Sequence, residues 1–328
     1  MTGHGTRPPL TFIIRPVPPF RLDLTAWALR RRARNVIDRW DGSSYRRVIR
    51  LGGRPTEIVV RQAAPSVESR LMVTATPAPR DRLGRQRVRG IVDRLLGVRV
   101  DLSGWYRMAA RDTRLRLLAD RFRGLKPPRF LTIFETLVNA FACQQLSLEV
   151  GLELLNRLAA VCDVRRGTAS DAYYGFPAPH DVARLRPSRY QAIGFSKQKV
   201  HALLALARAI EGRRLDLEWL VHGDDDEVCA RLLELRGVGR WTAEYVLLRG
   251  LGRLHVFPGD DVGAQKRLAR WLGRPDSLDY AGVRRAVEPW QPYAGVVYFH
   301  LLLDGLSHAG ALNAVAITPG KSSEGLGQ

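Results

Sequence analysis

Residues 235–262 carry two helix-compatible runs on either side of a four-residue turn and end in a pair of acids, reading LRGVGRWTAEYVLLRGLGRLHVFPGDDV. The turn contains Gly237 and Gly239, and glycine permits positive φ and leaves no Cβ in the way of a ligand. The helix expected to begin near Arg240 directs its unpaired N–H groups and its positive dipole end at the same place. The stretch therefore predicts an anion site, for which phosphate is the natural ligand.

A Gly-x-Gly turn before a helix is also a common tight turn, so the glycines alone do not identify a ligand. Arg240 beside the turn and Asp261 downstream make the combined pattern more specific. Asp261 precedes the helical run VGAQKRLARWL, where its whole role could be that of an N-cap, and Asp260 competes for that role. An N-cap carboxylate that faces a cleft can do both jobs, because the cap hydrogen bonds favour its ionised form.

The charge balance indicates a polyanionic partner. The 328 residues contain 52 Lys and Arg against 32 Asp and Glu, a formal net charge of +20, and nucleic acid is the commonest partner of such a chain. No apolar run approaches the roughly 20 residues that a membrane span needs, and MTGHGTRPPL has no signal-peptide core. Three widely spaced cysteines fit reduced thiols. We expect a cytoplasmic protein, nucleoid-associated if bacterial, without membrane binding or a side-chain metal site.

Changes in composition predict four regions. Residues 1–19 are Pro-rich and are expected to form an extended arm, and the Gly/Ser-rich residues 318–328 a disordered tail. Residues 20–112 predict an α+β domain, a small antiparallel sheet with helices on one side. Residues 113–317 predict a mostly α-helical region of two lobes with a cleft between them. The expected strands are 45–51, 57–61 and 70–76, with a hairpin turn at 52–55, and 84–96 is the expected helix of the α+β domain.

The helical region contains two groups of aromatic residues. Trp241 and Tyr245 are at i and i+4, so they share one helix face within a turn of the anion site, and they could form a wall for an extruded base. The run EPWQPYAGVVYFH brings Trp290, Tyr293, Tyr298 and Phe299 close together, but aromatics at helical spacing are usually core and predict no ligand alone. Spacing alone likewise favours solvated side chains for the polar pair Gln144-Gln145.

Together these motifs resemble the helix-hairpin-helix (HhH-GPD) superfamily of DNA glycosylases, specifically its 3-methyladenine DNA glycosylase II (AlkA-like) branch. LRGVGRWTA at 235–243 is similar to the superfamily's L-P-G-[VI]-G-x-x-T-A, with Arg236 in place of the proline. FPGDD at 257–261 matches the segment that carries the superfamily's catalytic aspartate. QQLS at 144–147 matches the segment whose tip enters the DNA stack in relatives. FPAPHDVARL at 176–185 and IGFSKQKV at 193–200 extend the resemblance to nearly the whole chain.

The resemblance implies a role for each motif. Asp261 would be the catalytic residue, and Gln145 the wedge in the DNA. The walls of the base pocket would be Trp241, Tyr245 and Trp290. The hairpin residues expected at the DNA backbone are Gly237, Val238, Gly239, Arg240 and Thr242. No cofactor is expected apart from a possible monovalent cation at the hairpin carbonyls, and the protein is expected to be a monomer.

Two positions depart from relatives. Bifunctional members such as endonuclease III carry a Schiff-base lysine where this chain has Trp241, so strand cleavage by that route is not expected. Ala294 replaces the usual arginine of a W-x-P-x-R pattern, which affects the expected pocket shape around Trp290.

We therefore expect a monofunctional DNA N-glycosylase that flips alkylated purines, of the 3-methyladenine and 7-methylguanine type, out of duplex DNA and excises them. Asp261 would stabilise the oxocarbenium ion or orient water. Electron-rich Trp241 and Tyr245 would favour a cationic base by about 0.5–2 kcal/mol each. Two alternatives stay open: a non-catalytic DNA-binding protein, and a glycosylase for oxidised or deaminated bases.

Overall fold

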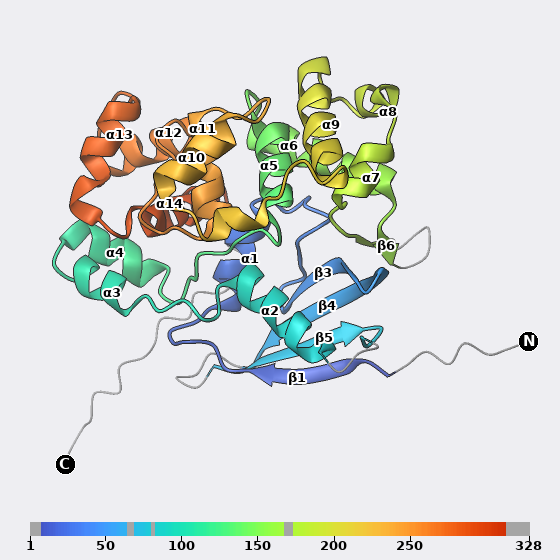
Figure 1. The fold of residues 1–328 in the computed structure, drawn as a ribbon. Helices are drawn as coiled ribbons and strands as arrows, with labels where there is room; N and C mark the ends of the chain where they lie inside the picture. The colour runs from blue at the N-terminus through green and yellow to red at the C-terminus, as the bar shows by residue number, and fades with distance from the viewer. Residues whose placement is uncertain (1–7, 64–68, 80–82, 167–172, 313–328) are drawn as a thin grey trace, which may run out of the picture.

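The computed structural model describes residues 8–63, 69–79, 83–166 and 173–312, so the predicted tail at 318–328 lies outside the described residues. Figure 1 shows a sheet on one side of the molecule and helices grouped in two lobes on the other. The predicted fold class, an α+β N-terminal part followed by a mostly α-helical region, is confirmed.

The sheet has five strands in the order β1-β5-β4-β3-β2, and every neighbouring pair is antiparallel. The register aligns Phe12, Val73, Val60 and Tyr45 in one row across four strands, and all four belong to one buried cluster. Gly52 and Gly53 have φ of 56° and 77° and form the tight turn between β3 and β4. The strands are β1 Leu10–Ile14, β2 Arg39–Trp40, β3 Ser44–Leu51, β4 Arg54–Gln62 and β5 Leu71–Thr76.

One boundary prediction is wrong at each end of the α+β part. Leu10–Ile14 was expected within an extended arm, but it pairs with β5 as an edge strand, because Phe12 and Ile14 bury their side chains against the sheet. Helix α3, Ser103–Ala109, lies within the predicted range 20–112, but its Trp105 packs in the core of a helical lobe.

Two helices and one ion-pair network join the sheet to the rest. Helix α2, Gly84–Leu96, covers the sheet (Figure 1). Helix α1, Leu22–Arg30, packs Ala26 and Leu29 in the sheet cluster and Trp27 in a helical lobe. On β3 the buried Arg47 donates to Asp38 at 2.7 Å and to Glu135 of helix α5, Ile133–Cys143, at 2.6 Å. Such a buried network fixes the position of one part relative to the other.

The C-terminal lobe combines two distant parts of the chain. Its helices share one core cluster. They are α3, α4 Thr113–Arg121, α12 Val262–Trp271, α13 Tyr280–Val287 and α14 Ala294–His308, with a short 3₁₀ turn at Glu288–Trp290.

The central lobe is formed by the chain between those two parts. It has its own core cluster and a two-residue strand pair, β6 Arg165–Arg166 and β7 Tyr173–Tyr174. Its helices are α5 Ile133–Cys143, α6 Leu148–Cys162, α7 Pro179–Arg184, α8 Pro187–Ala192, α9 Lys197–Glu211, α10 Asp225–Leu233 and α11 Arg240–Tyr245, with a 3₁₀ turn at Glu218–Val221. Helix α11 continues as a π-helical segment, Val246–Leu251.

Candidate active site

A groove of about 760 Å³ lies where the α5–α6 turn, the α10–α11 hairpin and the start of α12 meet. It contains the predicted wedge residue Gln145, the hairpin glycines Gly237 and Gly239, and the acid Asp261. Elements separated by more than a hundred residues in the sequence therefore contribute to one surface.

A deeper cavity of about 290 Å³ adjoins the groove. The two share six lining residues: Cys143, Leu146, Trp241, Asp261, Val262 and Gly263. Inside the cavity the rings of Trp241 and Tyr245 stack with centroids 5.3 Å apart and planes 30° apart, and both residues line it. The predicted acid and the two predicted aromatic walls thus lie around one hollow.

Asp261 is both an N-cap and a residue of that hollow. Its Oδ1 accepts a hydrogen bond of 2.7 Å from the backbone N–H of Ala264, which caps α12. Its Oδ2 accepts one of 2.9 Å from the hydroxyl of Tyr298 on α14. Burial, and then the charge of Asp261, raise the pKa of Tyr298 well above its usual range. Tyr298 therefore remains a donor throughout the physiological pH range and holds the carboxylate at the cavity.

Trp290 does not join the other two walls, and that prediction is wrong. It is 7% exposed in the core of the C-terminal lobe, where its ring meets that of Trp271 edge-on at 5.5 Å. Tyr298, expected only as a core aromatic, lines the cavity instead. Helix α14 begins at Ala294, and the side chain that faces Asp261 comes one turn later.

The two hairpin glycines differ in backbone conformation and in surroundings. Gly237 has φ of +84°, and a Cβ there would lie 2.9 Å from the Cβ of Ala202. Gly239 has an extended backbone, φ −113° and ψ −178°, and a Cβ there would meet nothing within 4 Å. Only Gly237 uses positive φ, whereas Gly239 leaves open space on the groove side of the hairpin.

Gln144 links the α5–α6 turn to the hairpin, which corrects the expectation of a solvated side chain. Its Nε2 donates to the carbonyl of Gly237 at 2.8 Å and to Oγ1 of Thr242 at 3.0 Å. The hydroxyl of Thr242 is therefore engaged within the protein, and Thr242 is buried, as is Val238. Lys199 of α9 donates to the carbonyl of Gln144 at 2.8 Å, which fixes the turn from the other side.

The next two residues of the turn project outward. Gln145 has φ of +57°, a left-handed conformation that costs a non-glycine residue energy, and it is exposed at the groove. Leu146 is 42% exposed and lines both the groove and the cavity. An exposed polar side chain and an exposed apolar side chain thus stand together at the cavity entrance.

The loop before Asp261 is tied to α11. Glu244 accepts from the backbone N–H of Gly259 at 2.8 Å and from the hydroxyl of Tyr280 at 2.9 Å. Arg240 donates to Asp260 at 2.7 Å and lies 3.7 Å from the Tyr280 ring centroid. Asp260 is thus occupied by an ion pair, and Asp261 is the acid at the N-cap of α12.

Two arginines that the sequence motifs did not single out also line the cavity. Arg31, just past the end of α1, donates to the hydroxyl of Tyr245 at 3.1 Å and to Asn139 at 2.6 Å. Arg249, in the π-helical segment, donates to the carbonyl of Ala28 at 3.1 Å. Arg31 lies about 230 positions before Asp261 in the sequence, so no local motif could connect them.

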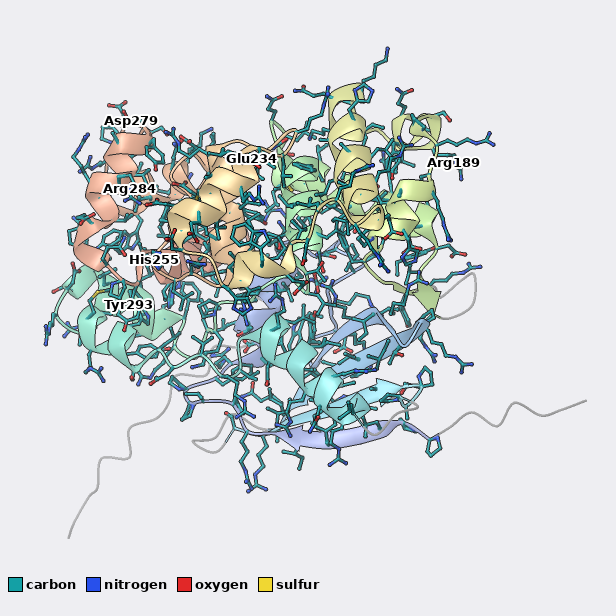
Figure 2. All side chains as sticks on the ribbon, viewed as in Figure 1. Arg189, Glu234, His255, Asp279, Arg284 and Tyr293 are labelled. Atoms are coloured by element: carbon teal, nitrogen blue, oxygen red, sulfur yellow. The ribbon has the colours of Figure 1, made fainter. Side chains whose placement is uncertain are left out.

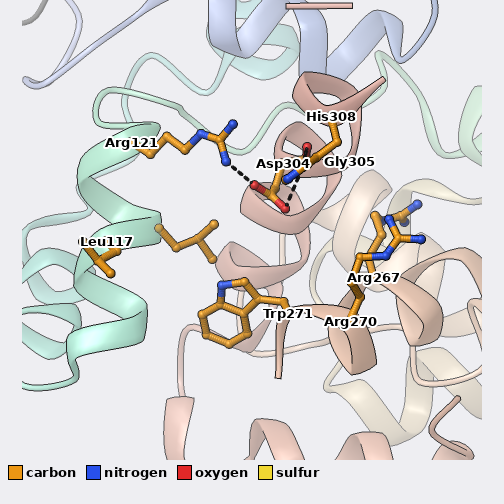
Figure 3. Close-up of a pocket in the computed structure, with 9 residues that line it drawn as sticks. Leu117, Arg121, Arg267, Arg270, Trp271, Asp304, Gly305 and His308 are labelled. Atoms are coloured by element: carbon orange, nitrogen blue, oxygen red, sulfur yellow. Dashed lines mark hydrogen bonds and ion pairs between the residues drawn. The ribbon is translucent and has the colours of Figure 1, made fainter. Parts of the chain in front are cut away.

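A separate pocket, of about 300 Å³, lies between α4, α12 and α14 (Figure 3). Asp304 in its wall accepts from Arg121 at 2.5 Å and pairs with His308 at 3.4 Å. It shares Arg267 with the inner cavity, but none of the predicted site residues lines it. On the outer faces of the lobes, arginines such as Arg189 and Arg284 extend into solvent (Figure 2).

Two kinds of feature are absent from the described residues. No helix there is long and apolar enough to cross a membrane, and no group of three or more His, Cys, Asp or Glu side chains there is arranged to hold a metal ion. The monovalent cation at the hairpin stays a prediction, and the carbonyl of Gly237 already accepts from Gln144.

Comparison with known proteins agrees with this geometry. The profile of the HhH-GPD superfamily base excision DNA repair proteins matches residues 138–292, which include the α5–α6 turn, the hairpin and Asp261. This part of the chain is an HhH-GPD region. The chain is also similar to DNA-3-methyladenine glycosylases, including a glycosylase 2, which supports the 3-methyladenine DNA glycosylase II (AlkA-like) branch.

Three similar proteins are informative. The DNA-3-methyladenine glycosylase of Bacillus subtilis is 28% identical over 205 residues, 62% of this chain and 68% of the relative. The DNA-3-methyladenine glycosylase 2 of Escherichia coli is 30% identical over 179 residues, 54% of this chain and 60% of the relative. The structure of the 3-methyladenine DNA glycosylase from Archaeoglobus fulgidus superposes with a TM-score of 0.78 at 24% identity, covering 89% of this chain and 97% of that one, and so shares the fold.

Proposed function

We propose that the protein is a monofunctional DNA glycosylase that removes alkylated purines from duplex DNA. The observation that carries the proposal is the single hollow shared by Asp261, Trp241 and Tyr245. An acid that only capped a helix would not need to face a cavity beside stacked aromatic rings. This arrangement favours an enzyme over a non-catalytic DNA-binding protein.

The groove supplies the surface for DNA. The hairpin with the open side of Gly239 would approach a phosphate, and Gln145 would enter the stack in place of the extruded nucleotide. The flipped base would pass Leu146 into the cavity and lie against Trp241 and Tyr245. The protein's net charge of +20 supports DNA as the partner.

Cleavage of the C1′–N bond leaves positive charge on the sugar, and the fixed carboxylate of Asp261 is placed to stabilise it or to orient the water that adds to C1′. The hydrogen bond from Tyr298 holds Oδ2 at the cavity during the reaction. Trp241 stands at the position of the lysine of bifunctional relatives, so strand cleavage through a Schiff base there is not part of the mechanism.

Asp261→Asn tests the proposal, because asparagine retains the N-cap but removes the charge. We expect release of 3-methyladenine and 7-methylguanine from methylated duplex DNA to fall by about a hundredfold or more. Asp279→Asn is the matched control: Asp279 caps α13 through the N–H of Gly282 at 2.7 Å and lies at the outer end of that helix (Figure 2). Full release by Asp261→Asn, or no release by the unaltered protein, would contradict the proposal.

A further inference from the structure

Two arginine side chains are buried in the wall of the cavity. Arg249 is 1% exposed and Arg31 5% exposed, and both line the cavity. Their charged groups lie over the same aromatic ring: the distance to the centroid of Phe130 is 4.8 Å for Arg249 and 5.2 Å for Arg31. Asp261 lines the same cavity.

These arginines have unused hydrogen-bond donors. Nε and Nη2 of Arg249 and Nε of Arg31 are buried without a hydrogen-bond partner. Within the described residues, neither arginine forms an ion pair with a carboxylate; their partners are the Ala28 carbonyl, the Tyr245 hydroxyl and Asn139. Leaving buried donors unpaired is costly, so in native proteins such groups often serve a function.

A flipped purine in one orientation would supply a hydrogen-bond acceptor for these unpaired donors. With the sugar at Asp261 and the ring along Trp241, the part of the base farthest from the glycosidic nitrogen points into the cavity. In a 6-oxopurine that part has O6, an acceptor, which arginine commonly recognises in guanine. In a 6-aminopurine the same part of the base has an N–H₂ group, so its N–H donors would face the N–H donors of the arginines.

We propose that Arg249, supported by Arg31, selects purines with an oxygen at position 6, such as 7-methylguanine and hypoxanthine, over purines with a 6-amino group. This inference rests on the proposed function and specifies its substrate class. Two cations in the cavity wall also oppose the preference for a positively charged base that Trp241 and Tyr245 alone would give.

The same contact assists departure of a neutral base. When the C1′–N9 bond of a hypoxanthine nucleotide breaks, its electron pair stays on the base and the negative charge spreads to O6, where a guanidinium stabilises it. Water supplies the hydroxyl that adds to C1′, and the proton that this water loses neutralises the departing base.

Methylated duplex DNA provides an internally controlled test, because 7-methylguanine and 3-methyladenine are released in one reaction and both are cationic before cleavage. We expect Arg249→Met to lower the ratio of 7-methylguanine to 3-methyladenine release by about tenfold, and Arg249→Lys to restore part of it. Arg94→Met is the matched control: Arg94 is a largely buried arginine that donates to the carbonyls of Phe130 and Gly250 at 2.8 and 2.7 Å but does not line the cavity. An unchanged ratio in a folded Arg249→Met protein would overturn the inference.

The unaltered protein provides a second test that does not require a variant to fold or a base to leave. Duplexes with an uncleavable 2′-fluoro nucleotide would carry either hypoxanthine or purine without a 6-substituent. We expect the hypoxanthine duplex to bind about tenfold more tightly, and equal affinity would overturn the inference. If the protein bound the hypoxanthine duplex more tightly but released no base from methylated DNA, the result would contradict the proposed function and not this inference.

Discussion

The hydroxyl of Tyr298 donates a 2.9 Å hydrogen bond to Oδ2 of Asp261, while Oδ1 of the same carboxylate caps α12. The proposed catalytic acid is therefore held by two helices of the C-terminal lobe, one through its backbone and one through a side chain. Both oxygens are oriented before DNA binds, which is the condition for electrostatic stabilisation of a developing cation.

Tyr298→Phe removes one of these two constraints without changing the ring. We expect base release to fall by about tenfold, because a hydrogen bond to a charged group contributes about 1.5–3 kcal/mol. Single-turnover excision measures this effect. Tyr190→Phe is the control, since its hydroxyl donates to the carbonyl of Val182 in the central lobe, away from the cavity. Equal losses in both variants would show that Tyr298 only supports the fold.

The two hairpin glycines give opposite predictions. Gly239→Asn should leave the stability unchanged, because the backbone is extended and asparagine is a good N-cap. Its side chain should fill the open side of the hairpin and weaken binding to damaged and undamaged duplexes alike. Gly237→Ala should instead destabilise the fold by about 1–2 kcal/mol, because of its positive φ. Thermal unfolding and duplex titration separate the two; loss of affinity for damaged DNA alone in Gly239→Asn would exclude a backbone contact.

Gln145→Gly should separate stability from activity. Gln145 has φ of +57°, which glycine adopts without strain, so the melting temperature should not decrease. Excision from duplex DNA should decrease more than excision from a single strand, because only the duplex needs a side chain to fill the emptied position. Arg213→Gly, at another exposed residue with φ of +54°, should leave both excision rates unchanged. A Gln145→Gly protein with full duplex activity would exclude the wedge.

Much of this architecture follows from periodicity. The helix predicted at 84–96 and the main strands are present in the structure. Apolar residues at helical spacing share one buried face only in a helix, and alternating apolar residues share one only in a strand. Edge strand β1 was missed because its five residues lie between prolines and pair with β5, some sixty positions away. Helix α3 is short, and its place depends on where Trp105 finds a core.

The candidate site shows the same division. The hairpin, Asp261 and the stacked pair of Trp241 and Tyr245 are local in sequence, and a motif can predict them. Tyr298 and Trp290 are both aromatics at helical spacing, and only the packing of α14 decides which of them reaches the cavity. Long-range contacts of this kind are invisible to local spacing.

Because His300 is buried, we expect the folded protein to lose stability in mild acid. Burial lowers its pKa from 6.5 to about 4, so between those values the unfolded chain takes up a proton that the folded protein does not. Stability from this group is complete above pH 6.5 and is lost as the pH falls, by up to about 1.4 kcal/mol per pH unit. Thermal unfolding of His300→Phe should show a shallower decline from pH 6.5 to pH 4, and a parallel decline would contradict a buried neutral imidazole.

Arg31 stands just beyond α1, in the part of the chain that also builds the sheet, yet its guanidinium reaches Tyr245 inside the cavity. The amino-terminal third is thus a structural component of the proposed reaction chamber. A shortened protein that began at the first helix of the central lobe would retain the hairpin and the acid, but its chamber would be open to solvent on one side.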